Sequence, residues 1–276
     1  MVAQRHTMPW VALVVCAGCA VPSVTQRAES LVRQNHDDEA IVLLRERLRN
    51  QPQDIPARRL LVRVLASAGA MVEARAEVAK LAERLPQDDP TPYIELGHAL
   101  ELSHLYDEAL DAYDRASDVA PSSPEGPREG GLRCARWGEA EPAASRLEEA
   151  VRRGARDVET LHALGLVRLN LGDFEGAERA YREAVAADPR AADGWLGLAT
   201  VAVARGDAAG ALDAYEQVLA RRPRFAPAEL GRAWALARLG RRDEASRALD
   251  HAEELGAPAA NVARQRAALQ SPGSVR

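Results

Sequence analysis

Alanine recurs along this chain with a period of 34 residues, interrupted once by a step of 35. The alanines of the series are Ala40, Ala74, Ala109, Ala143, Ala177, Ala211 and Ala245. A larger apolar residue follows each of them by four positions, and a glycine precedes most of them by five. A period of this length predicts a solenoid, in which similar supersecondary units stack and each contacts only its neighbours.

One period, residues 158–191, indicates what each unit contains. Leu161 and Leu164 fall on one face of a first helix, and Gly172 ends that helix because glycine takes the left-handed conformation without strain. A second helix with its own apolar face follows and ends at Pro189, since proline cannot continue a helix. The chain has 28% charged and 4% aromatic residues and lacks the alternating pattern of strands, so we expect an all-α fold.

The repeated unit resembles the tetratricopeptide repeat, whose consensus reads W-x2-L-G…G-x4-A-x3-[FY]-x2-A-x4-P. Residues 192–225 carry this pattern at Trp195, Leu198, Gly206, Ala211, Tyr215 and Pro223. The resemblance extends over nearly the whole chain beyond residue 20. It implies a right-handed superhelical solenoid of antiparallel helix pairs.

The period also divides the chain into segments. We expect a lipoprotein signal peptide at residues 1–18, followed by a lipidated N-terminus and a degenerate first repeat at 19–54. This repeat matches the pattern mainly in its second helix. Six tetratricopeptide repeats are expected at 55–259, and a C-terminal capping helix and tail at 260–276.

The unit at residues 124–157 departs from its neighbours. Pro127, Gly130 and Gly131 stand where the other units have helix-forming residues. An interior glycine costs a helix about 1 kcal/mol relative to alanine. The sequence therefore predicts that residues 126–136 form the least stable first helix of the array.

The first residues carry a targeting pattern. Arg5 precedes an apolar stretch at 10–18, which is too short for a permanent membrane helix and suits the core of a signal peptide. The stretch ends in a motif that resembles a bacterial lipobox, with Cys16 at the usual leucine position and Cys19 as the residue to be acylated. Ala20 resembles the sorting residue of outer-membrane lipoproteins. We expect an anchor at the periplasmic face of the outer membrane; the alternative is cleavage after Ala20 and release as a soluble periplasmic protein.

Other residue patterns exclude several classes of function. The net charge is −5 without a basic block, which disfavours nucleic acid as a partner. His98 and His104 are six residues apart, so they lie on different helix faces, and no cysteine stands at ligand spacing from them. Cys134 falls on the buried side of its helix, where cysteine behaves as a small hydrophobe. We therefore expect no enzyme activity, no metal and no cofactor.

The resemblance implies a partner-binding groove, because the first helix of each tetratricopeptide unit lines the concave surface of the superhelix. The candidate groove residues are Arg59, Arg63, His98, Arg128, Arg136, His162, Asn170, Leu196, Leu230 and Trp234. The first half of this surface is polar and cationic and the second more apolar, which favours an extended peptide or a helix as ligand. The alternative is that the arginines are merely solvated and that Leu166, Leu169 and Val203 belong to a partly covered core.

The function expected from these features is a non-enzymatic protein-protein interaction scaffold that holds another envelope protein in its groove. Lipidated chains of about six such repeats resemble the pilotins that help assemble type IV pilus secretins. Two alternatives remain open, namely an adaptor or regulator of cell-wall enzymes and a soluble periplasmic adaptor.

Overall fold

The computed structural model describes residues 22–270, and all regular secondary structure within them is α-helical. The expected all-α fold is thus confirmed. The signal-peptide stretch with Cys19 and the tail beyond residue 270 lie outside the described residues. The helices are α1 (Val24–Arg33), α2 (Asp37–Asn50), α3 (Ile55–Ser67), α4 (Met71–Ala82), α5 (Thr91–Leu102), α6 (Tyr106–Val119), α7 (Glu125–Trp137), α8 (Ala140–Arg152), α9 (Val158–Asn170), α10 (Phe174–Ala187), α11 (Ala192–Arg205), α12 (Ala208–Arg221), α13 (Ala226–Arg238), α14 (Arg242–Glu254) and α15 (Ala259–Gln270).

Each odd-numbered helix from α1 to α13 packs against the even-numbered helix that follows it, and α15 packs on the last pair. The first unit contains a first helix, α1, although its sequence matches the repeat pattern mainly in the second helix. Ser23 and Gln26 form a capping box at the start of α1, and Ala28 is fully buried. The capping box satisfies backbone groups that the consensus pattern does not report on.

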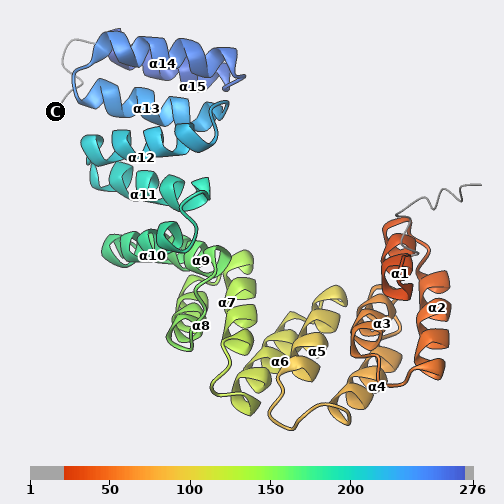
Figure 1. Ribbon diagram of the computed structural model, residues 1–276. Coiled ribbons are helices and arrows are strands. Elements are labelled where there is room, and N and C mark those ends of the chain that lie inside the picture. Colours follow the sequence, from red (N-terminus) through yellow and green to blue (C-terminus); the bar gives the residue numbers. More distant parts are fainter. Residues whose placement is uncertain (1–21, 271–276) are drawn as a thin grey trace, which may run out of the picture.

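The stacked helices form an open arc (Figure 1). Each odd-numbered helix packs closely against the next odd-numbered helix, whereas within residues 22–270 the backbones of the even-numbered helices stand farther apart. Side-chain ion pairs such as Arg45–Glu73, Arg75–Glu108 and Asp114–Arg146 link the even-numbered helices. In a curved stack, neighbouring helices lie closer together on the inside of the curve than on its outside. The odd-numbered helices therefore form the inner layer of the arc, as α1 and α7 show in Figure 1, and the even-numbered helices form the outer layer.

Tyrosine rings and glycines set the spacing between units in the C-terminal half. The ring of Tyr181 on α10 is only 1% exposed. A Cβ on Gly165 of α9 would lie 2.7 Å from this ring, and a Cβ on Gly197 of α11 would overlap it. The two glycines thus let α9 and α11 close on the tyrosine from both sides, because a larger side chain would overpack the contact.

The glycines of α7 have a similar role. A Cβ on Gly131 would lie 2.8 Å from Leu147 on α8, and a Cβ on Gly130 would lie 3.1 Å from Arg146. The helix itself runs without a break from Glu125, with Pro127 in its first turn, where proline is tolerated. The segment thus combines a low intrinsic helix propensity with close packing against α8. Its relative stability remains a prediction.

Cys134 of α7 is fully buried, as its position in the repeat predicted. Burial raises the pKa of its thiol to about 11, so that the thiol is protonated at neutral pH. Between residues 22 and 270, no helix has the length and apolar character needed to cross a bilayer.

Candidate partner-binding face

The six odd-numbered helices from α3 to α13 present one continuous surface, which we call the inner face. All ten residues predicted to line a groove lie on these helices. They do not have equal access to a ligand. The N-terminal part of the inner face, on α3, α5 and α7, is dominated by charged pairs, and the C-terminal part, on α9, α11 and α13, by apolar side chains.

Glu95 is the centre of the N-terminal part. Its side chain on α5 is fully buried and accepts hydrogen bonds from two arginines of α3. Arg63 donates twice, over 2.8 and 2.7 Å, and Arg59 once, over 2.8 Å. Burial by itself would raise the pKa of the Glu95 carboxyl, but the hydrogen bonds and charges of Arg63 and Arg59 outweigh it and lower that pKa. Glu95 is therefore ionised and links two units.

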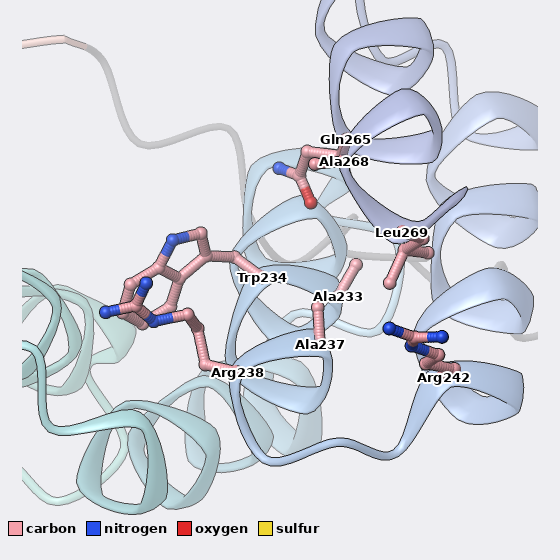
Figure 2. A pocket seen from close by; sticks show the side chains of 8 residues that line it. All are labelled: Ala233, Trp234, Ala237, Arg238, Arg242, Gln265, Ala268 and Leu269. Atoms are coloured by element: carbon pink, nitrogen blue, oxygen red, sulfur yellow. The ribbon is translucent and has the colours of Figure 1, made fainter. Parts of the chain in front are cut away.

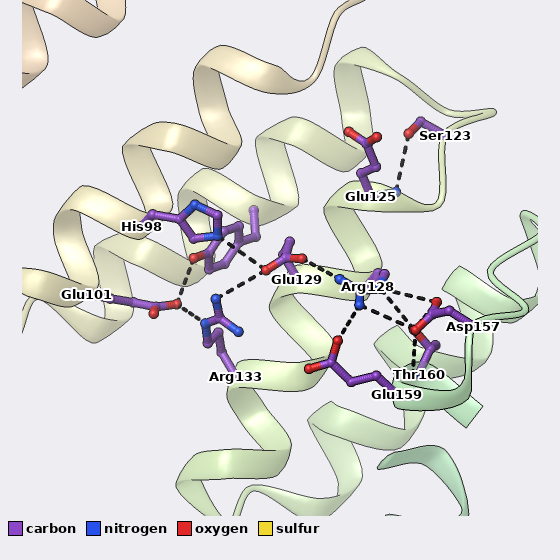
Figure 3. Close-up of polar contacts among 11 residues, drawn as sticks. His98, Glu101, Ser123, Glu125, Arg128, Glu129, Arg133, Asp157, Glu159 and Thr160 are labelled. Atoms are coloured by element: carbon purple, nitrogen blue, oxygen red, sulfur yellow. Dashed lines mark hydrogen bonds and ion pairs between the residues drawn. The ribbon is translucent and has the colours of Figure 1, made fainter. Parts of the chain in front are cut away.

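A second charged network joins α5, α7 and α9 (Figure 3). Glu129 of α7 lies between His98, 3.2 Å from its Nε2, and the guanidinium groups of Arg128 and Arg133. Arg133 also donates to Glu101 over 2.6 Å. Burial opposes ionisation of Glu129, but the bond from His98 and the charge of Arg133 outweigh it and lower the pKa of its carboxyl. Both carboxylates are thus satisfied within the protein.

Arg128 extends this network to the start of α9. It contacts Asp157 at 3.3 Å and donates to Glu159 over 2.6 Å and to the Thr160 hydroxyl over 3.0 Å. Asp157 is also the N-cap of α9, where it accepts from the backbone of Thr160 over 3.0 Å. Arg128 therefore holds two units together, and its side chain is only 24% exposed.

These pairs disagree with the alternative interpretation, in which the arginines are merely solvated. Arg59, Arg63 and Arg128 are bound by carboxylates of the following unit, and the prediction missed Glu95 and Glu129 altogether. A separation of 32 residues could have indicated such pairs from the sequence, because contacts between neighbouring units recur at that spacing. These contacts are Arg63–Glu95, Glu101–Arg133, Asp114–Arg146 and Arg128–Thr160.

Two of the predicted polar residues are available to a ligand. Arg136 of α7 and Asn170 of α9 are exposed, and neither has an ion pair or side-chain hydrogen bond with any residue between 22 and 270. They lie on adjacent first helices, at the boundary between the charged and the apolar part of the inner face.

The apolar part begins on α9. Leu166 is 45% exposed. Leu196 of α11 and Leu230 of α13 are half-buried. His162 lies against the Tyr181 ring, with 5.5 Å between ring centroids, and burial lowers the pKa of its imidazole. His162 is therefore neutral at pH 7 and belongs to the apolar part.

Trp234 stands at the C-terminal end of this surface. The Arg238 guanidinium lies 5.7 Å from the centroid of the indole ring, in a cation–π contact. Figure 2 shows both side chains on one side of α13, next to a small pocket of about 160 Å³ between α13 and α15. Gln265 and Leu269 of α15 form the opposite wall. The sequence did not predict this wall, because it depends on how the last helix folds back.

The inner face contains no recognisable reaction centre. Throughout the described part of the chain, no group of three or more histidine, cysteine or acidic side chains is arranged to hold a metal ion. Arg63, Arg128 and Arg133 pair with carboxylates of an adjacent unit, whereas Arg136 is unpaired within the described residues. This face is therefore suited to recognition by shape, apolar contact and charge.

Comparison with known proteins identifies this architecture. A family model described as tetratricopeptide repeat matches residues 25–90 and 162–227, and a second model with the same description matches residues 202–269. Together they cover more than half of the chain. The chain belongs to the tetratricopeptide repeat family. Proteins with these repeats are protein-protein interaction scaffolds, and the fold is typically non-enzymatic. No curated protein matches the chain.

Solved structures of other tetratricopeptide repeat proteins share the fold at low sequence identity. YrrB, a TPR protein with an unusual peptide-binding site, is 20% identical with a TM-score of 0.62, covering 69% of this chain and 97% of YrrB. The C-terminal part of a TPR repeat-containing protein from Cytophaga hutchinsonii is 14% identical with a TM-score of 0.66, covering 87% and 98%. PilW, a type IV pilus biogenesis factor, is 17% identical with a TM-score of 0.52, covering 72% and 92%.

Proposed function

We propose that this tetratricopeptide repeat protein binds an extended segment or a helix of another envelope protein on the C-terminal part of its inner face. The observation that carries the proposal is the row of accessible apolar side chains on three consecutive inner helices, with Leu166 at 45% exposure and Leu196, Leu230 and Trp234 half-buried. A concave surface with accessible apolar groups favours a docked peptide or helix. Arg136 and Asn170, at the edge of this row, are free to bond the backbone of the ligand.

The finer proposal is a lipid anchor on Cys19 and a pilotin-like role in assembling a type IV pilus secretin. The lipobox-like motif supports the anchor. The likeness to PilW supports the fold alone, so the pilus role rests on the combination of a lipoprotein signal with about six repeats. The alternative functions are an adaptor or regulator of cell-wall enzymes and, without the anchor, a soluble periplasmic adaptor.

Crosslinking in cells tests the binding face and the partner together. A photo-reactive amino acid at Leu166, on the inner face, should form an adduct with the partner. The same amino acid at Val72, which is 84% exposed on the outer helix α4, is the matched control and should not. A secretin in the adduct supports the pilotin-like role, and a cell-wall hydrolase supports the alternative. Equal adducts at both positions would contradict the proposed face.

Replacement of Trp234 measures the contribution of the apolar row. Trp234→Ala is expected to weaken partner binding by about 1 kcal/mol or more, because buried aromatic side chains commonly anchor an interface. Trp195→Ala is the control, since Trp195 contacts Arg221 on the adjoining outer helix. Titration calorimetry gives the affinity, and circular dichroism gives the helix content. Loss of helix content in Trp234→Ala would show that Trp234 is a core residue instead.

Cellular fractionation tests the anchor. Cys19→Ser is expected to move the protein from the membrane pellet to the soluble periplasmic fraction, because only an acylated cysteine can hold this chain at the membrane through the lipobox. Cys134→Ser, which removes a cysteine far from the lipobox, is the control and should leave the protein in the pellet. A soluble parent, or a Cys19→Ser variant that still sediments with the membrane, would refute the lipoprotein assignment.

A further inference from the structure

A second surface of the molecule carries chemistry that the proposed function does not use. It is a pocket of about 630 Å³ bounded by α2, α3 and α4, outside the inner face. We call it the basic pocket. Its charged lining residues are Arg45, Arg49, Arg58, Lys80, Arg84 and a single acid, Glu77. A pocket with five cations and one carboxylate is unexpected in a chain with a net charge of −5.

The single carboxylate, Glu77, cannot neutralise all five cations, because two of them already share it. Glu77 accepts a hydrogen bond from Arg58 and another, over 2.6 Å, from Lys80. Arg49 has no ion pair with any residue between 22 and 270. Arg84 lies 3.7 Å from Glu83, at the outer limit of an ion pair, and donates to the Lys80 backbone carbonyl over 2.7 Å. Arg45 is paired with Glu73, which lies outside the pocket lining, so the surplus of positive charge rests on Arg49 and Arg84.

Two of the arginines also have unsatisfied donors. The Nε atoms of Arg58 and Arg84 are buried without a hydrogen-bond partner. The Arg58 side chain is only 5% exposed and is fixed from both ends, since it donates to Glu77 and to the Pro52 carbonyl. A buried donor without a partner is costly and rare, and an unoccupied ligand site is one physical reason for it.

We propose that the basic pocket binds a phosphate-bearing ligand. Guanidinium groups present paired N–H donors that match the oxygens of a phosphate, and those of Arg49 and Arg84 are the least engaged in the pocket. Arg58 and Lys80 are held in place by Glu77 and add positive charge to the wall of the pocket. The volume leaves room for a ligand larger than a single phosphate group, such as a diphosphate or a phosphate-bearing headgroup.

Two sources supply this chemistry. One is the headgroup of an anionic phospholipid, and the other is a soluble phosphate compound. The pocket belongs to the first two units, which follow Cys19 most closely in the sequence. Basic residues near a membrane surface are attracted to anionic lipids, and this attraction falls off over a short distance.

Binding measurements on the full chain test the proposal, with inorganic pyrophosphate as the soluble probe. Calorimetry should detect pyrophosphate binding to the parent, and Arg49→Gln with Arg84→Gln should weaken it by about tenfold or more, since each removes a charge-assisted bond. Arg264→Gln, an exposed arginine of α15 without an ion pair within the described residues, is the matched control and should bind like the parent. Arg49→Gln alone guards against misfolding of the double variant, because Arg49 is exposed and unpaired.

Vesicle sedimentation distinguishes the two sources. If the ligand is a lipid headgroup, the parent should sediment more with vesicles that contain phosphatidylglycerol than with phosphatidylcholine vesicles, and the double variant should lose this difference. If the source is soluble, pyrophosphate should bind while the two vesicle types retain the protein equally. The proposal is overturned if neither probe binds, or if Arg264→Gln reduces binding as much as the double variant does.

Discussion

Replacing both Arg59 and Arg63 with methionine is expected to destabilise the protein by about 3 kcal/mol at pH 7, because it leaves a buried carboxylate without a counter-charge. Glu95 is fully buried and has hydrogen bonds from these two side chains. Methionine keeps the cover over Glu95 while removing the charge. Urea unfolding followed by circular dichroism gives the free energy of unfolding. Exposed arginines without ion pairs, Arg115 and Arg264, provide the matched double control, which should lose little stability.

The pH dependence of this loss tests its cause. In the parent, the pKa of Glu95 is lowered from its ordinary value of 4.5, so its ionised form stabilises the fold above that value, and this contribution is lost as the pH falls toward the lowered pKa. In the double variant only burial acts, and the pKa of Glu95 rises. The stability gap between parent and variant should therefore shrink below neutral pH. A gap that stays constant down to pH 4 would show that lost packing, and not charge, causes the loss.

Introducing a methyl group at Gly197 is expected to destabilise the C-terminal half by about 2 to 3 kcal/mol, because it overpacks a buried contact. The added Cβ would overlap the ring of Tyr181, which Gly165 already confines from the other side. On a free helix the same change would be favourable by about 1 kcal/mol, since alanine is the better helix former. Thermal or urea unfolding of Gly197→Ala should therefore show a lower free energy of unfolding, whereas helix propensity alone would raise it.

A double-mutant cycle isolates the steric term. The preceding interface has Leu147 and Ala163 at the positions that Tyr181 and Gly197 occupy, again 16 residues apart. Combining Tyr181→Leu with Gly197→Ala reproduces that natural pair. In the Tyr181→Leu background, Gly197→Ala should cost little or stabilise the protein. An equal cost in both backgrounds would mean that contact with the ring is not the reason for glycine at this position.

The sequence predicted the fold of this chain well because the period and the small residues act locally. Gly165 and Tyr181 lie in one unit, so their close approach falls within a single repeat. Gly197 was not recognised, since its partner lies in the preceding unit and the register between units is not visible within a single repeat. The capping box of α1 was also missed, because the consensus pattern does not include it.

The candidate site was predicted less well for the same reason. All ten predicted residues lie on inner helices, which follows from the repeat alone. The pairing of Arg59, Arg63 and Arg128 with acids of the next unit depends on which side chains meet across an interface. Glu95 stands at a position of the repeat that is not expected to face a ligand, and the wall of the Trp234 pocket comes from α15, which lies outside the repeats. Whether Trp234 and Leu230 contact a partner remains a prediction.

The one-sided contacts of the arc make it mechanically asymmetric. Tightening the curve would press the odd-numbered helices, which already touch, against one another, and close packing resists compression. Straightening it would separate the same helices and strain links such as Arg63–Glu95, while the even-numbered helices, whose backbones stand farther apart and are joined by side-chain ion pairs such as Arg75–Glu108, would offer less resistance. The inner layer thus provides most of the elastic resistance of the molecule, and the packing distance between its helices sets the curvature of the arc.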